Sequence, residues 1–178
     1  MQTTTATTPD FGAIVRANAP YVWRVLRRLG VREADVEDVA QDVFVVVHRK
    51  LPQFEGRSAL RTWIYGICAR TASDHRRLAH VRREEATSRP PERAGSAPQL
   101  AELEARDRRA LLDAALDALD DDKRAVLVLY EIEEVPMKDV ADALGCPLQT
   151  AYSRLHAARR ELKVAVEERQ RALEKELA

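Results

Sequence analysis

The segment from Pro136 to Lys163 constrains the fold of this chain more than any other stretch, because its pattern predicts two helices joined by one tight turn. Gly145 lies where the first helix should end in the left-handed conformation, and Pro147 suits the first turn of the next helix. The apolar residues that recur at helical spacing on the two sides of the turn are Val140, Ala141 and Leu144, then Leu148, Ala151, Leu155, Ala158 and Leu162. We therefore expect two helices that pack these apolar faces inward.

The second helix of the pair carries a polar face opposite its apolar one. At about 100° per residue this face holds Gln149, Ser153, His156 and Arg160, with Tyr152 at its edge and Arg154 and Arg159 beside the apolar stripe. Hydrogen-bonding side chains with basic neighbours suit the major groove, which predicts a DNA-binding helix-turn-helix. A plain helical bundle would share the apolar pattern. The small Ala141, and an outer face without alternating Glu and Lys, favour the DNA-binding interpretation.

Composition predicts an all-α protein without export or membrane signals. The 178 residues include only six Gly and 5% aromatic residues, and no alternating β-branched run predicts a strand. The start lacks a charged and an apolar region, and no stretch approaches about 18 uninterrupted apolar residues, so we expect a cytoplasmic protein without membrane insertion. Cys68 and Cys146 have no partners at metal-ligand spacing, and we expect both to be small buried apolar residues.

A change of composition divides the chain into two small helical domains. Residues 84–100 lose apolar periodicity and gain three Pro together with Gly and Ser, which is typical of a flexible linker. The first domain, residues 11–83, is expected to contain a short helix from Phe11 and a second one after Pro20. A third helix is expected over about residues 34–51 and a fourth from near Ser58.

The second domain covers residues 101–163 and ends in the predicted helix-turn-helix. Its first helix is expected from about Ala101, followed by a turn and cap at residues 120–122 and by a short helix. Residues 164–178 form a charged tail that we expect to prolong the last helix.

Opposite charges are segregated along a chain whose formal net charge is zero. Residues 33–42 carry five acidic residues and no basic one, whereas residues 70–83 carry five Arg against Asp74 alone. The outer face of the predicted third helix holds Glu37, Asp38, Gln41 and Asp42. Because phosphates repel carboxylates, this face suits a basic surface on a protein partner and not DNA. On charge alone, a merely solvated helix face is the alternative.

Three motifs in this order resemble those of the extracytoplasmic-function (ECF) group of bacterial sigma factors. They are VEDVAQDVF at Val36–Phe44, ALRTWIY at Ala59–Tyr65 and TAYSRLHAARREL at Thr150–Leu162. The resemblance covers nearly all of residues 11–163. It implies a factor that directs promoter-specific transcription initiation. The first domain would then dock on core RNA polymerase and open the minus-ten element of promoter DNA, and the second would bind the minus-thirty-five element. It also implies an anti-sigma factor as a further partner.

The resemblance and the side-chain chemistry together assign residues to three surfaces. The polymerase-binding residues are Glu37, Asp38, Gln41 and Asp42. The minus-ten residues supply aromatic surface, a carboxylate for a cytosine amino group and cations for phosphates. They are Trp63, Tyr65, Arg70, Asp74, His75, Arg76, Arg77, Arg82 and Arg83. The minus-thirty-five residues are Gln149, Thr150, Tyr152, Ser153, Arg154, His156, Arg159 and Arg160.

Some of these assignments have alternatives. Trp63 also fits a core position at helical spacing, and Tyr65 fits the core and the surface about equally. Arg159 can instead pair with Glu161 or Glu167 on the surface, an interaction that contributes little to stability.

The chain also departs from the family pattern. Many relatives have Arg-Asn where it has Ala69 and Arg70, and a bulky or basic residue where it has Gly66. Tyr152 and Ala157 occupy positions that are often basic. The preferred promoter bases therefore cannot be transferred from relatives.

Two other functions compete with this interpretation. A free-standing helix-turn-helix regulator would use the helix pair alone and bind a ligand or a protein through its first domain. An enzyme is disfavoured because the His residues at 48, 75, 80 and 156 lack ligand spacing such as HExxH, and no phosphate-cradling Gly loop or nucleophile with a base is present. We expect no catalytic residue, no metal and no cofactor.

Overall fold

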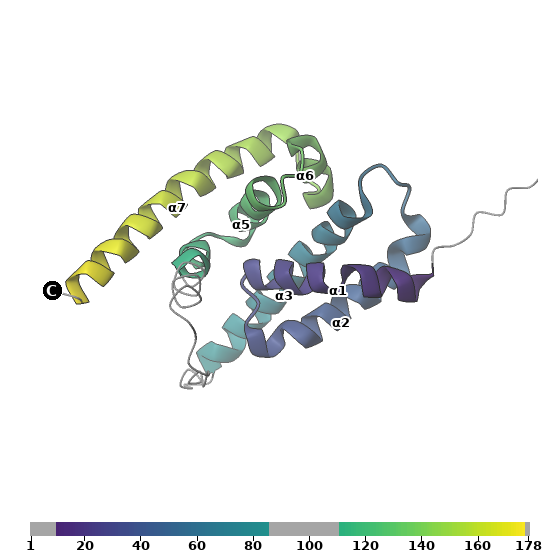
Figure 1. The fold of residues 1–178 in the computed structure, drawn as a ribbon, viewed down its shortest axis with the longest axis horizontal. Helices are drawn as coiled ribbons and strands as arrows, with labels where there is room; N and C mark the ends of the chain where they lie inside the picture. The colour runs from purple at the N-terminus through teal and green to yellow at the C-terminus, as the bar shows by residue number, and fades with distance from the viewer. Residues whose placement is uncertain (1–9, 86–110, 177–178) are drawn as a thin grey trace, which may run out of the picture.

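The computed structural model describes residues 10–85 and 111–176, with side chains described for 10–79 and 111–172. Within these ranges the chain forms helices and turns and contains no strand, as an all-α fold requires (Figure 1). Most of the predicted linker, residues 84–100, and the start of the second domain, residues 101–110, lie outside the described residues. None of the described helices has both the length and the apolar content needed to cross a membrane.

The first domain is a bundle of three mutually packed helices, α1 (Phe11–Arg28), α2 (Val36–Lys50) and α3 (Leu60–Glu85). Short 3-10 turns, η1 (Glu33–Asp35) and η2 (Leu51–Gln53), flank α2. The fully buried side chains that all three helices contribute to this core include Val22, Val25, Leu26, Val36, Val39, Val43, Val47 and Ile64. Burying each of them stabilises the fold by roughly 1.5–3 kcal/mol. The core fixes which face of each helix remains outside.

Pro20 lies inside one continuous helix, so the predicted division into two helices at this residue is wrong. On one side α1 buries Ile14, Tyr21 and Val22, and this apolar face runs past the proline without a break. Proline has no N–H, so the Arg16 carbonyl lacks its usual helical hydrogen-bond partner at Pro20. Both residues are exposed, so this carbonyl lies on the side of the helix that water reaches. Tertiary packing outweighs the local cost of the proline.

The second domain comprises helical residues 111–117, then α5 (Asp121–Leu127), a π-helical turn η3 (Val128–Ile132), α6 (Met137–Leu144) and α7 (Leu148–Glu176). The predicted cap at the start of α5 is present, because the Asp120 carboxylate accepts a hydrogen bond from the Lys123 amide at 2.8 Å. The predicted left-handed residue between α6 and α7 is Gly145, with φ of 66°. α7 continues through the charged tail as expected.

The two domains pack against each other, with α5 and α6 between the three-helix bundle and α7 (Figure 1). The closest approach is at Gly66 of α3, where an added Cβ would lie 2.3 Å from the Ala143 carbonyl oxygen of α6. Only a glycine fits there without movement of one helix. On the same side of α3 the Tyr65 hydroxyl donates a hydrogen bond to the Ala125 carbonyl at 2.8 Å.

Ion pairs surround this contact between the domains. Glu133, after η3, accepts a hydrogen bond from Arg28 at 2.6 Å and lies 3.7 Å from the guanidinium of Arg24. Its side chain is only 12% exposed, so ion pairs with these two arginines of α1 replace most of the contact of the carboxylate with water. Arg76 of α3 pairs with Asp121 of α5 at 2.8 Å. The interface therefore combines close backbone packing with charge complementarity.

Arg124 is an unfavourable element of the same interface. Its side chain is 1% exposed, and its Nη2 donates to Asp117 at 2.8 Å, while Nε and Nη1 have no partner among the described residues. Nη1 lies over Gly30, where an added Cβ would be 1.9 Å away. Burial, and next the nearby charge of Arg76, lower the pKa of Arg124. Unfilled donors on a buried cation cost free energy, which opposes the packing of the domains.

Candidate nucleic-acid interface

The amino-terminal half of α7 has the predicted two-sided character. Ala151, Leu155 and Ala158 are buried against α5 and α6, and Leu162 is half-buried. The polar residues on the opposite side, all exposed, are Gln149, Ser153, His156 and Arg160. Tyr152, predicted at the edge of this face, is 41% exposed. The expected rotation of the helix is confirmed, and its polar face is open to a large partner.

Leu148, however, was expected to pack inward and is 46% exposed, so that prediction is wrong. It is the first residue of α7. The residues before it, Cys146 and Pro147, form the turn and not a further helical turn that could cover it. Periodicity assigns a face to a residue, but at a helix end it does not say whether another element reaches that face.

The polar face differs in hydrogen-bonding capacity from residue to residue. The Ser153 hydroxyl donates to the Gln149 carbonyl at 2.9 Å, so its oxygen remains available only as an acceptor. The amide of Gln149 and the ring of His156 are exposed and retain both donor and acceptor capacity. Residues 148–160 contain three Arg, one His and no Asp or Glu. This acid-free segment is electrostatically suited to phosphates.

The arginines beside the apolar stripe are engaged within the protein. Arg154 pairs with Asp122 of α5, and Arg159 donates to Glu131 of η3 at 2.7 Å. The predicted alternative partners of Arg159, Glu161 and Glu167, are therefore wrong. Both acids lie on α7 itself, but Arg159 instead reaches Glu131 of η3, which packs beside this part of the helix. Thr150 is half-buried, and no ion pair joins the exposed Arg160 to another described residue.

The acidic face of α2 is exposed at all four predicted positions, Glu37, Asp38, Gln41 and Asp42. No ion pair joins its three carboxylates to another residue within the described ranges. The acids just before the helix behave differently, because Glu33 pairs with Arg27 at 2.9 Å and Asp35 pairs with Arg32 at 2.7 Å. The α2 face thus presents uncompensated negative charge to solvent.

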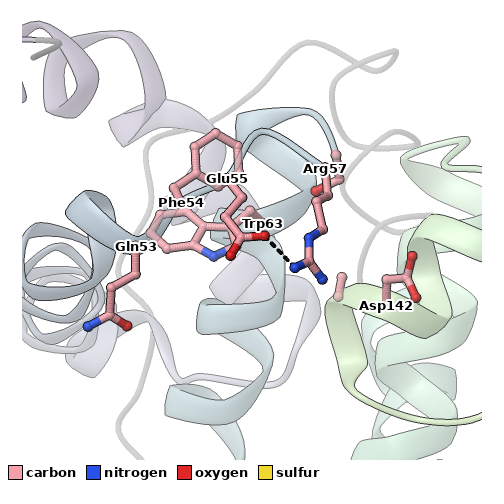
Figure 2. Close-up of a pocket in the computed structure, with 8 residues that line it drawn as sticks. Gln53, Phe54, Glu55, Arg57, Trp63 and Asp142 are labelled. Atoms are coloured by element: carbon pink, nitrogen blue, oxygen red, sulfur yellow. Dashed lines mark ion pairs between the residues drawn. The ribbon is translucent and has the colours of Figure 1, made fainter. Parts of the chain in front are cut away.

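Trp63 of α3 lies at a hollow between the two domains (Figure 2). Its ring packs against Phe54 with the ring centres 5.0 Å apart and the planes tilted by 42°. The hollow measures about 410 Å³ and is lined by Gln53, Phe54, Glu55, Arg57, Ser58, Trp63, Asp142 and Ala143. Sequence reasoning missed Phe54 and Arg57. The available signal was an isolated aromatic residue followed by charged ones in the short connection between two helices.

Tyr65 does not supply the exposed aromatic surface that the sequence suggested. Its ring is fully buried between α3 and α5, with its hydroxyl bonded to the Ala125 carbonyl. Burial strongly raises the pKa of this phenol. Tyr65 is therefore a core residue, which was one of the two expectations, because the second domain covers the side of α3 on which the ring lies.

Most charged minus-ten candidates on α3 have partners within the protein. His75 lies 3.3 Å from Asp35, and Arg77 pairs with Asp74 at 2.8 Å. Arg76, besides its pair with Asp121, donates to the Leu29 carbonyl at 3.4 Å.

Arg70 is exposed, and the side chains of Arg82 and Arg83 lie outside the described ones. Burial by itself would raise the pKa of Asp35, but hydrogen bonds from Arg32 and His75 outweigh it and lower that pKa.

The described residues contain no group of three or more His, Cys, Asp or Glu side chains placed to hold a metal ion. Cys68 is buried as predicted, and burial raises the pKa of its thiol to about 12, which keeps it protonated. Cys146 is half-buried beside the turn of the helix pair.

Comparisons with known proteins match both domains. The sequence fits the family models of Sigma-70 region 2 over residues 14–81 and of Sigma-70, region 4 over residues 109–162. It is 32% identical over 143 residues to the RNA polymerase sigma-H factor of Pseudomonas aeruginosa, covering 75% of this chain and 74% of that protein. It is 32% identical over 153 residues to the ECF RNA polymerase sigma factor SigC of Mycobacterium tuberculosis, covering 83% and 78%.

The fold has a counterpart among solved structures. The sigma factor RpoE of Bartonella quintana, solved in complex with the anti-sigma factor NepR, matches with a TM-score of 0.66 and 22% identity over 89% of this chain and 97% of that one.

Proposed function

Because this chain belongs to the ECF group of RNA polymerase sigma factors, which direct promoter-specific transcription initiation, we propose that three of its surfaces divide this work. The observation that carries the proposal is the amino-terminal half of α7, whose polar side is exposed and free of carboxylates. That half of α7 binds the minus-thirty-five element in the major groove. Gln149, Ser153 and His156 approach base edges, while Thr150, Arg154, Arg159 and Arg160 lie nearer the phosphates.

The acidic face of α2 binds core RNA polymerase. Its carboxylates are exposed and uncompensated by described residues, which suits a basic protein surface and excludes phosphates. Charge complementarity between this face and its partner contributes mainly to association rate and specificity.

The minus-ten element binds α3 and the connection before it. The hollow at Trp63 and Phe54 offers aromatic surface for an unpaired base, with the Arg57 guanidinium at its rim (Figure 2). Asp142 and Ala143 of α6 form its far wall. We infer that α6 moves away from α3 when the promoter opens, because a DNA strand needs access to that side of α3. The ion pair between Arg76 and Asp121 then breaks, and Arg76 pairs with a phosphate of the DNA.

The remaining parts of the proposal follow from the family. The chain works in the cytoplasm, where the polymerase is, and catalyses no covalent step of its own. An anti-sigma factor is its regulatory partner, as NepR is for the Bartonella protein. A free-standing regulator is the less favoured alternative, because both domains match sigma-factor family models.

Transcription in vitro with core polymerase on a promoter library tests the function. The chain is expected to direct initiation from a subset of sequences that share two short elements. If purified chain binds such sequences equally well without polymerase and directs no initiation, the regulator alternative is correct.

Charge reversal tests the polymerase surface. Asp38→Lys and Asp42→Lys should each weaken binding to core polymerase. Asp42→Lys should leave the unfolding midpoint unchanged because its side chain is exposed, whereas Asp38→Lys should lower it slightly because Asp38 lies in the first turn of α2. Glu168→Lys is the matched control, since it makes the same charge change at an exposed position of α7. Equal affinity for the α2 variants and the control would remove the assigned surface.

A further inference from the structure

Two apolar side chains lie exposed where α7 begins, in the segment proposed to enter the major groove. Leu148 is 46% and Tyr152 is 41% exposed. They are four residues apart, so they lie on one side of the helix, one turn from each other. Neither side chain is part of the core of the second domain.

The chemistry around this pair points to DNA as its occupant. Gln149 and Ser153 follow Leu148 and Tyr152 along the helix and face the same solvent. The segment 148–160 has no carboxylate, and the exposed Arg160 adds positive charge two turns further along. An apolar pair in an acid-free segment that also carries the exposed Arg160 is complementary to a polyanion that presents apolar groups.

The major groove offers one such apolar group, the C5 methyl of thymine, which adenine, guanine and cytosine lack. A recognition helix places its first residues closest to the base edges. We propose that Leu148, together with Tyr152, forms an apolar edge that selects thymine within the minus-thirty-five element. Tyr152 stands where relatives are often basic, so this edge would give the chain a preference of its own. The inference rests on the proposed function.

Deoxyuridine tests the proposal, because it differs from thymidine only by the absence of this methyl group. The minus-thirty-five element is first selected from a promoter library by the holoenzyme of core polymerase and full chain. Each thymine of the element, on either strand, is then replaced singly by uracil. At one or two positions, uracil should weaken binding of the holoenzyme about fourfold, the effect of exposing one buried methyl-sized group.

The same series with Leu148→Ala should show a smaller loss, less than about twofold at any position, because Tyr152 alone remains of the apolar edge. Val164→Ala is the matched control. It removes an apolar side chain of the same helix that is 48% exposed but lies beyond the acid-free segment, and it should keep the fourfold loss. Unfolding midpoints of the three proteins should agree, since both residues are exposed.

The proposal is overturned if uracil has no effect at any position, if wild type and Leu148→Ala lose equally, or if the selected element contains only G·C pairs. A Leu148→Ala protein that binds core polymerase more weakly, with an unchanged response to uracil, would assign this edge to a protein contact instead. In these cases wild-type chain still directs initiation, so the proposed function stands. If it directs none, both are overturned.

Discussion

Helices α3 and α7 were both predicted to contact DNA, yet they differ in how far their candidate side chains are exposed in the structure. The polar-face candidates on α7, which are Gln149, Ser153, His156 and Arg160, lie outside the packed helix pair and are exposed to solvent. Those on α3 are largely occupied, since Tyr65 is buried, His75 faces Asp35 and Arg76 is paired with Asp121. The comparison teaches that the proposed minus-thirty-five surface is already exposed, whereas much of the proposed minus-ten surface is buried or paired within the protein. Under the proposed function, duplex DNA binds α7 as it is, and melted DNA requires the helices around α3 to rearrange.

The largest effect is expected where α7 is anchored. Leu155→Ala should lower the free energy of unfolding by about 2–5 kcal/mol, because this side chain is buried between the helices of the pair. Urea unfolding followed by circular dichroism measures it. Tyr152→Ala, on the exposed side of the same helix, should change stability by no more than about 0.5 kcal/mol. Similar losses for both variants would mean that the rotation of α7 is wrong and that its polar face is not preformed.

The next largest effect concerns the cover over α3. Gly66→Val should cost roughly 1–3 kcal/mol and separate α3 from α6, because its Cβ would overlap the Ala143 carbonyl. The distance between fluorophores attached at Arg70 and Lys138, both exposed, should increase. Ala13→Val is the control, since it introduces the same side chain at an exposed position inside α1. An unchanged distance in Gly66→Val would show that the two domains do not depend on this contact.

A smaller effect is expected at the start of α5, which lies between the two compared helices. Asp120→Ala should cost about 1 kcal/mol through loss of the helix cap. Burial alone would raise the pKa of Asp120, but hydrogen bonds from the amide and ammonium of Lys123 lower it below its ordinary value.

The sign of the pH effect follows from that lowered pKa. The stabilisation by Asp120 is present above the unfolded pKa of about 3.9 and is lost as the pH falls through the folded pKa. Asp120→Ala should therefore differ from wild type in thermal midpoint at pH 7, and the difference should shrink as the pH falls through the lowered pKa of Asp120. A constant difference across this range would contradict the assigned cap.

The smallest effect is expected at an exposed pair of α3. Arg77→Ala should change the free energy of unfolding by less than about 0.5 kcal/mol, because its partner Asp74 is equally exposed. In promoter binding the same change should reduce the slope of affinity against salt by about 0.9, the loss of one phosphate contact. Arg16→Ala, which breaks an exposed pair in α1, should leave that slope unchanged. Equal slopes for wild type and Arg77→Ala would remove Arg77 from the minus-ten surface.

The sequence by itself determined the all-α fold, the helix pair with its turn at Gly145, the cap at Asp120 and the buried and polar sides of α7. Each of these is a local property, because helical periodicity and turn conformation depend on residues within one or two turns of each other. The failures came where distant elements meet. The helix break at Pro20 was overruled by one continuous core face, and Leu148 is exposed because no described element covers the side of α7 on which it lies.

Only the tertiary structure decided that Tyr65 is covered by α5, that Arg159 pairs with Glu131 and that Trp63 shares a hollow with Phe54. The burial of Tyr65 and the far wall of the hollow depend on how α3 crosses α5 and α6, where Gly66 approaches Ala143 closely. The Arg159 pair depends on how η3 packs beside α7. Helical periodicity places a side chain on one side of its own helix. What then lies against that side depends on the packing of residues far apart in the chain, which periodicity does not specify.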